Sequence, residues 1–154
     1  MGKEKSDAGR PPVYKTPEEM QIKIDEYFER CAGETLVNTD GDAVYDKHGR
    51  PIIINDKPPT ITGLALALGF NSRTSLLNYA ARDGKEGEAE KPFLNTITRA
   101  KSRVEEYAEM RLFDKDGANG AKFSLANNFK QWKEKPDGAE MNNNAIIKVT
   151  LTDD

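Results

Sequence analysis

The sequence predicts a mainly α-helical protein: an N-terminal helix-turn-helix domain with an inserted small β-hairpin, a central α-helical hairpin for oligomerisation, and a short C-terminal β-strand. Three observations predict this fold class. Apolar residues recur at steps of three and four in several stretches, as one buried helix face requires. A glycine interrupts the apolar block 60–82 near its centre, which is typical of two short helices joined by a turn. Two turn signals, Asp40-Gly41 and His48-Gly49, separate short β-prone pieces.

The chain divides into four parts by composition. Its 154 residues suffice for one domain or two small helical modules. The predicted parts are a flexible tail over 1–15, a helix-turn-helix domain over 16–83 with its β-hairpin insert at about 34–58, a helical oligomerisation region over 92–132, and a linker with a C-terminal strand over 133–154.

The overall charge limits what one copy of the chain can do. The formal net charge is -3, whereas Lys and Arg that neutralise phosphates supply most of the non-specific affinity for DNA. A single copy should therefore bind DNA weakly, and several copies on one DNA would gain affinity through avidity. The single cysteine, Cys31, fits a reducing cytoplasm and a small buried side chain. Since no run of about 18 apolar residues and no signal peptide are present, we expect neither a membrane nor a secreted protein.

The first helix is predicted to begin at Thr16-Pro17-Glu18-Glu19 and to end at Gly33. Threonine is a capping residue, proline suits the first helical position, and a glutamate is placed to complete a capping box. The residues expected on its buried stripe are Met20, Ile24, Tyr27, Phe28 and Cys31.

The block 60–82 predicts a helix-turn-helix, in which the second helix enters the DNA major groove. Ala65 stands four residues before Gly69, and Phe70 follows as the apolar plug of the turn. The next core position, Leu76, comes one residue late, so we expect a longer turn than usual. The alternative is a helical hairpin that only packs. The residues expected to contact DNA are Asn71, Ser72, Arg73, Thr74, Asn78 and Arg82.

The N-terminal tail contains a second candidate DNA contact. Gly9-Arg10-Pro11 resembles the core of minor-groove arms, in which an extended arginine enters a narrow groove. Arg10 is therefore a candidate contact, although a solvated tail is the commoner explanation of such a segment.

The insert offers little evidence for a metal site. Asp40, Asp42 and Asp46 weakly resemble a calcium loop, but the later glutamate and the interior glycine spacing are missing. His48 is the only histidine, so a turn residue is the expected role and we predict no metal.

A long helix is predicted over 92–113, followed by a turn and a second helix over 121–132. We expect the seam of the long helix to pack between chains, because little other core is available to cover it; packing within the chain is the alternative. The seam follows a heptad pattern and consists of Phe93, Ile97, Ala100, Val104 and Tyr107. The expected buried residues of the second helix are Phe123, Leu125 or Ala126, Phe129 and Trp132.

The last β-prone segment, 145–152, places Ile147, Val149 and Leu151 on one face. A solitary strand is not stable in water, so it should pair with the chain's own ribbon or with the same strand of other subunits.

Catalytic motifs are missing from the sequence. It has no GxxxxGK[ST] phosphate loop, no cysteine cluster, no paired histidines and no credible Ser-His-Asp arrangement. We therefore expect a protein that is not an enzyme and needs no cofactor.

Four segments together resemble the small terminase subunit of tailed bacteriophages. They are GRPPVYKTPEEM (9–20), PTITGLALALGFNSRTSLLNY (59–79), FLNTITRAKSRVEEY (93–107) and GAKFSLANNFKQWKEK (120–135). The resemblance implies a non-catalytic homo-oligomeric ring that recognises double-stranded viral DNA in the cytoplasm of the bacterial host. It also implies that the C-terminal region, with Ile147, Val149 and Leu151, contacts the large terminase subunit, which carries the ATPase and nuclease.

Two other classes of protein share part of this pattern. A dimeric helix-turn-helix transcriptional regulator would use the same motif but read two half-sites about one helical turn apart. A protein-interaction module would use the helices only to bind partners and would show no salt-sensitive DNA binding.

Overall fold

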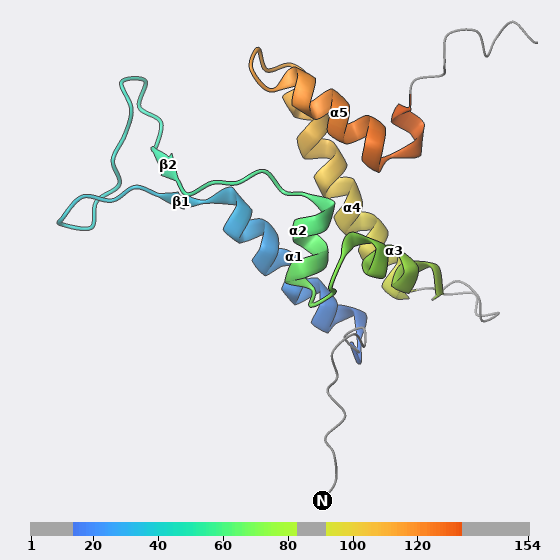
Figure 1. The fold of residues 1–154 in the computed structure, drawn as a ribbon. Coiled ribbons are helices and arrows are strands. Elements are labelled where there is room, and N and C mark those ends of the chain that lie inside the picture. Colours follow the sequence, from blue (N-terminus) through green and yellow to red (C-terminus); the bar gives the residue numbers. More distant parts are fainter. Residues whose placement is uncertain (1–13, 83–91, 134–154) are drawn as a thin grey trace, which may run out of the picture.

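The computed structural model describes residues 14–82 and 92–133, and in these ranges the chain is mainly helical (Figure 1). Its elements, in chain order, are α1 (Pro17–Ala32), β1 (Glu34–Thr35), β2 (Ile53–Ile54), α2 (Ile61–Ala67), α3 (Arg73–Arg82), α4 (Pro92–Arg111), α5 (Ala118–Asn128) and the 3-10 helix η1 (Lys130–Trp132). The predicted mainly α architecture with a small β insert is confirmed. The predicted strand over 145–152 lies outside the described residues.

Local signals set both ends of α1, as predicted. The Thr16 side chain accepts a hydrogen bond from the Glu19 amide at 3.2 Å, and the Glu19 carboxylate accepts one from the Lys15 amide at 3.1 Å. The helix ends at Gly33, whose φ is +76°. A Cβ at this position would lie 2.5 Å from the Ile54 carbonyl oxygen, so only glycine fits where β1 begins.

The insert between α1 and α2 is built from three segments that hydrogen-bond to one another in a cycle. The Leu36 amide donates to the Ile52 carbonyl, the Val44 amide to the Leu36 carbonyl, and the Ile52 amide to the Val44 carbonyl, at 2.8 to 2.9 Å. These three residues are spaced eight apart, and β1 pairs antiparallel with β2 at the base of the insert. In Figure 1 the insert projects away from the helices.

The same turn is used twice within the insert. The Asn38 side-chain oxygen accepts hydrogen bonds from the amides two and four residues later, each at 2.9 Å. Eight residues on, Asp46 does the same at 2.8 and 2.9 Å. Gly41 and Gly49, at φ of +88° and +75°, complete the two turns. Asp46 therefore serves as a turn residue, and His48 lies in the same turn.

Two apolar cores hold the helices together. The first lies between α1, α2, α3 and the first half of α4, and its largest fully buried members are Met20, Ile24, Leu64, Leu68, Leu76 and Ile97. The second lies between the start of α2, the second half of α4 and α5, and comprises Ile61, Val104, Ala108, Leu125 and Phe129. Because α4 contributes to both cores, it connects the two halves of the described fold.

The expectation for the heptad seam of α4 is corrected by these cores. Ile97 and Ala100 are buried in the first core and Val104 in the second, while Phe93 packs half-buried against the first. Ile97, Ala100 and Val104 therefore pack against helices of the same chain, whereas the half-buried Phe93 keeps exposed surface. The heptad spacing of α4 is therefore explained by packing against helices of the same chain.

The helix after α4 also differs from the prediction in its bounds and in one face. It begins at Ala118, ends at Asn128 and is followed by η1. Ala121 and Leu125 face α4, whereas Phe123, predicted to be buried, is 72% exposed. The physical reason is position: Phe123 lies two residues from Leu125, on the opposite side of the helix. Trp132 instead donates its indole N–H to the Glu105 carboxylate at 2.7 Å.

Candidate nucleic-acid interface

The turn between α2 and α3 is fixed by backbone hydrogen bonds. The Phe70 amide donates to the Ala65 carbonyl at 2.9 Å, and the Gly69 amide donates to the Leu66 carbonyl at 3.0 Å. This pair of bonds is a Schellman motif, with Gly69 in the left-handed region at φ +85°. Phe70 is 2% exposed and closes the turn against the first core. The predicted stop at glycine and the predicted apolar plug are both confirmed.

Ser72 begins α3 as its cap. Its Oγ accepts a hydrogen bond from the Ser75 amide at 3.1 Å and lies 3.0 Å from the Ser75 hydroxyl. The Ser72 hydroxyl thus already has two partners within the chain, which leaves it less able to contact DNA than its neighbours.

The underside of α3 anchors the helix. Leu76 and Ala80 are buried in the first core. The Tyr79 ring stands edge-on to Phe70, with ring centroids 5.3 Å apart, and edge-on to Phe93 of α4 at 6.1 Å. These contacts fix which side of α3 faces outward.

The outward side of α3 carries most of the residues predicted to contact DNA. Thr74 and Asn78 lie one helical turn apart and are exposed, and Asn71 is exposed just before the helix. Arg73 is half-exposed at the first helical position. Arg82 is the last residue of α3, and its side chain is outside the described part.

The local charge differs from that of the whole chain. Residues 61–82 contain two arginines, Arg73 and Arg82, and no Asp, Glu or Lys, although the chain as a whole has a formal charge of -3. An exposed helix with hydroxyl, amide and guanidinium groups and no carboxylate can donate hydrogen bonds to phosphates and base edges without repelling them.

Tyr14 ties the N-terminal segment to this helical pair. Its hydroxyl donates to the Leu68 carbonyl at 2.6 Å, and its ring packs against the first core. Burial, followed by the effect of Tyr79, raises the Tyr14 pKa, so the hydroxyl keeps its proton at neutral pH. Arg10 lies outside the described residues.

Tyr14 was absent from the predicted site. The available signal was a lone aromatic residue two positions before the capping Thr16 in an otherwise polar tail. Such a residue is placed to contact the helices that follow.

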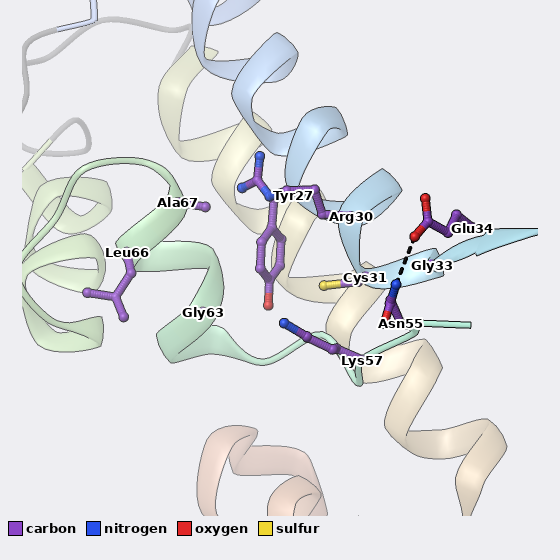
Figure 2. Close-up of a pocket in the computed structure, with 10 residues that line it drawn as sticks. All are labelled: Tyr27, Arg30, Cys31, Gly33, Glu34, Asn55, Lys57, Gly63, Leu66 and Ala67. Carbon is purple, nitrogen blue, oxygen red and sulfur yellow. Dashed lines mark hydrogen bonds between the residues drawn. The ribbon is translucent and has the colours of Figure 1, made fainter. Parts of the chain in front are cut away.

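A hollow of about 570 Å³ lies on another side of α2, between α1 and the base of the insert (Figure 2). Tyr27 crosses it, accepting a hydrogen bond from the Thr60 amide at 2.8 Å and donating one to the Thr60 carbonyl at 3.2 Å. Figure 2 shows the Arg30 and Lys57 side chains at its edges. Tyr27 thereby fixes the start of α2, whose cap is Thr60.

Several predicted contact residues stay untested by this geometry. Tyr107 is half-exposed on α4, while Ile147, Val149 and Leu151 lie outside the described residues.

Within the described ranges no group of three or more His, Cys, Asp and Glu could hold a metal ion. No helix in these ranges is long and apolar enough to cross a membrane.

The described part of the chain is a small helical fold in which the outward side of α3 carries polar and cationic groups and no carboxylate. A profile of the family described as DNA-packaging protein gp3 matches residues 9–138, and the chain belongs to this family. Comparison with curated proteins and with solved structures finds no match. The predicted relation to packaging proteins of phages is therefore confirmed, and a role in genome packaging follows from the family.

Proposed function

We propose that the chain is a small terminase subunit that recognises viral double-stranded DNA at the packaging site. In this proposal α3 is the reading helix of a helix-turn-helix, and Arg73, Thr74 and Asn78 make the central contacts. Arg82 and Arg10 add phosphate and minor-groove contacts at its flanks. The chain is a recognition subunit in the host cytoplasm and not an enzyme.

The observation that carries the proposal is the outward face of α3 in a chain of the DNA-packaging family. Its underside is held by Leu76, Ala80 and Tyr79, so the exposed Thr74 and Asn78 are presented on a rigid element. Rigid presentation matters because base-edge contacts require fixed geometry. The half-exposed Arg73 adds a positive charge just after the turn between α2 and α3, and the Tyr14 hydroxyl bonds to Leu68 just before that turn.

The negative overall charge supports a further part of the proposal, assembly into a ring. One α3 offers few cationic contacts, so one copy should dissociate readily at physiological salt. A ring presents many copies of the same helix to one DNA and raises the effective affinity without new contacts. The C-terminal segment, including Ile147, Val149 and Leu151, would then recruit or regulate the large subunit that carries the ATPase and nuclease.

Binding measurements on α3 variants test the DNA contact. Fluorescence anisotropy with labelled duplex from the packaging region, at 50 and 200 mM salt, gives affinity and salt dependence for wild type, Arg73→Ala and Asn78→Ala. If Arg73 contacts a phosphate, its loss weakens binding to all sequences. It also lowers the slope of log affinity against log salt concentration by about 1 per subunit bound. Loss of a bidentate adenine contact at Asn78 costs about 1–3 kcal/mol, chiefly on the specific site.

Matched controls lie on other elements of the chain. Lys115→Ala removes an exposed cation from the turn between α4 and α5, and Gln21→Ala removes an amide from α1. Both should bind DNA as the wild type does. If Arg73→Ala and Asn78→Ala bind as tightly as these controls, α3 is not the reading helix. A two-chain particle in native mass spectrometry would favour the dimeric transcriptional regulator instead of the ring.

A further inference from the structure

The insert exposes an apolar face that the described part of the chain leaves uncovered. Val37, Tyr45 and Ile53 are 54%, 60% and 45% exposed. Each follows one of the three residues that form the cycle of hydrogen bonds, at the same eight-residue spacing. The cycle relates the three segments, so these residues occupy equivalent positions in it. We call Val37, Tyr45 and Ile53 the insert face.

A second exposed aromatic residue lies on α5. Phe123 is 72% exposed, on the side of α5 opposite to Ala121 and Leu125. The insert face and Phe123 do not cover each other within one chain, since both remain exposed and lie on different elements (Figure 1). Two separate apolar surfaces on one chain are the requirement for a head-to-tail contact between copies.

The charges around the two surfaces are complementary. Residues 34–58 contain five acidic and three basic side chains, a formal charge of -2, and their acidic members include the exposed Asp40 and Asp42 at the first turn. Residues 118–133 contain Lys122, Lys130 and Lys133 and no acidic residue, a formal charge of +3. Two insert faces packed on each other would bring like charges together, whereas an insert face on α5 brings opposite charges together.

The size of the surfaces sets the strength of such a contact. Tyr45 and Phe123 each expose on the order of 100–180 Å² of aromatic side chain, given that such side chains bury about 150–250 Å². A standard interface buries about 800 Å² per partner, a little over half of it apolar. One contact between the insert face and α5 is therefore weak alone, and it gains stability when a closed ring makes each copy contribute both surfaces.

We propose that the insert face of one copy docks on the outer side of α5 of the next copy, around Phe123. The contact is heterologous, so repetition closes a ring or extends a filament and does not stop at two chains. This inference rests on the ring assembly of the proposed function and adds to it the two surfaces that meet. The insert thereby becomes an assembly element and not a DNA contact.

Cysteine cross-linking of the full chain tests the pairing directly. In a Cys31→Ser background, Tyr45→Cys and Phe123→Cys are made as separate proteins, each with one thiol. Under mild oxidation, the mixture of the two should give covalent pairs that contain one chain of each kind, while either protein alone gives none. Pairs formed by Tyr45→Cys alone would show insert-to-insert contact and overturn the proposal.

The oligomeric state of charge variants provides the second measurement. Tyr45→Glu and Phe123→Glu should each raise the concentration for half-assembly about thirtyfold or more in mass photometry, as loss of a central aromatic contact does. Ile22→Glu is the control, because Ile22 is 59% exposed on α1 and should leave assembly unchanged. Circular dichroism checks that each variant keeps its helices.

The outcomes separate this inference from the proposed function. If the wild type forms a ring that both glutamate variants leave intact, and the mixture gives no mixed pairs, the docking is wrong and the ring stands. If the wild type is a single chain at all concentrations, both the ring and the docking fail. DNA binding by Arg73→Ala is compared with wild type at the same protein concentration, so it tests α3 separately from the docking.

Discussion

The contact between Tyr27 and Gly63 allows a double-mutant test of how α2 is positioned. A Cβ at Gly63 would overlap the Tyr27 hydroxyl oxygen and would lie 3.0 Å from Thr60 Oγ1. The same hydroxyl bonds to the amide and carbonyl of Thr60, which caps α2. The variants are Gly63→Ala, Tyr27→Phe and the double variant.

The geometry sets the size of each effect. Tyr27→Phe leaves the Thr60 amide without its partner, which costs about 1–3 kcal/mol. Gly63→Ala forces the hydroxyl aside at a cost of about 1–3 kcal/mol, offset by up to about 1 kcal/mol of helix propensity. In the double variant the closest obstructing atom is gone. The double variant should therefore lose about 1 kcal/mol less than the sum of the single losses.

Urea unfolding followed by circular dichroism measures these free energies, at one protein concentration because assembly adds to apparent stability. Gly120→Ala is the control: it lies in α5, and a Cβ there meets nothing within 4 Å. This variant should be stabilised, by up to about 1 kcal/mol. If the two single losses add within about 0.3 kcal/mol, Tyr27 and Gly63 are not coupled and the reasoning is refuted.

Three further predictions concern groups whose partners the structure defines. Several hydrogen bonds, first among them the one from the Arg50 amide, lower the Asp46 pKa. The turn is therefore stabilised above about pH 4 and loses that stabilisation as the pH falls further. NMR titration should show this loss, with Asp46→Asn retaining the turn and Asp46→Ala losing it. Burial raises the Tyr27 pKa, so its stabilising contribution is complete below about pH 10 and is lost as the pH rises beyond it; Tyr27→Phe should flatten this alkaline decline in unfolding experiments. Glu105→Ala removes the acceptor of the Trp132 indole, and a red shift of tryptophan fluorescence with an unchanged helical circular dichroism spectrum should follow; an unshifted spectrum would contradict the contact.

The parts of the fold that could be predicted are those with local causes. Thr16 caps its helix as expected, and the glycines at 33 and 69 follow the ends of α1 and α2, because capping and left-handed residues act within one turn of the chain. The β insert followed from its two glycine turns in the same way. Its cyclic arrangement did not, because hydrogen bonds among three segments depend on all of them at once.

Errors occurred where periodicity leaves the partner open. The seam of α4 has the spacing of a coiled coil, but the same spacing suits a helix that packs on α1 and α5 of its own chain. Phe123 was predicted to be buried as part of an amphipathic helix, whereas its position relative to Leu125 places it outside. The outward residues of α3 could be predicted because Leu76 and Ala80 fix the opposite side, and their contact with DNA stays a prediction.

The sharing of α4 between both cores bears on how the chain can be cut for experiments. A fragment that stops after α3 would lack Ile97 and Ala100, and so would leave the apolar surfaces of α1 and α2 open to solvent. Such a peptide would tend to aggregate, and its failure to bind DNA would reveal nothing about the reading helix. Deletion studies of this protein therefore need C-terminal boundaries beyond Phe129, where the second core is complete.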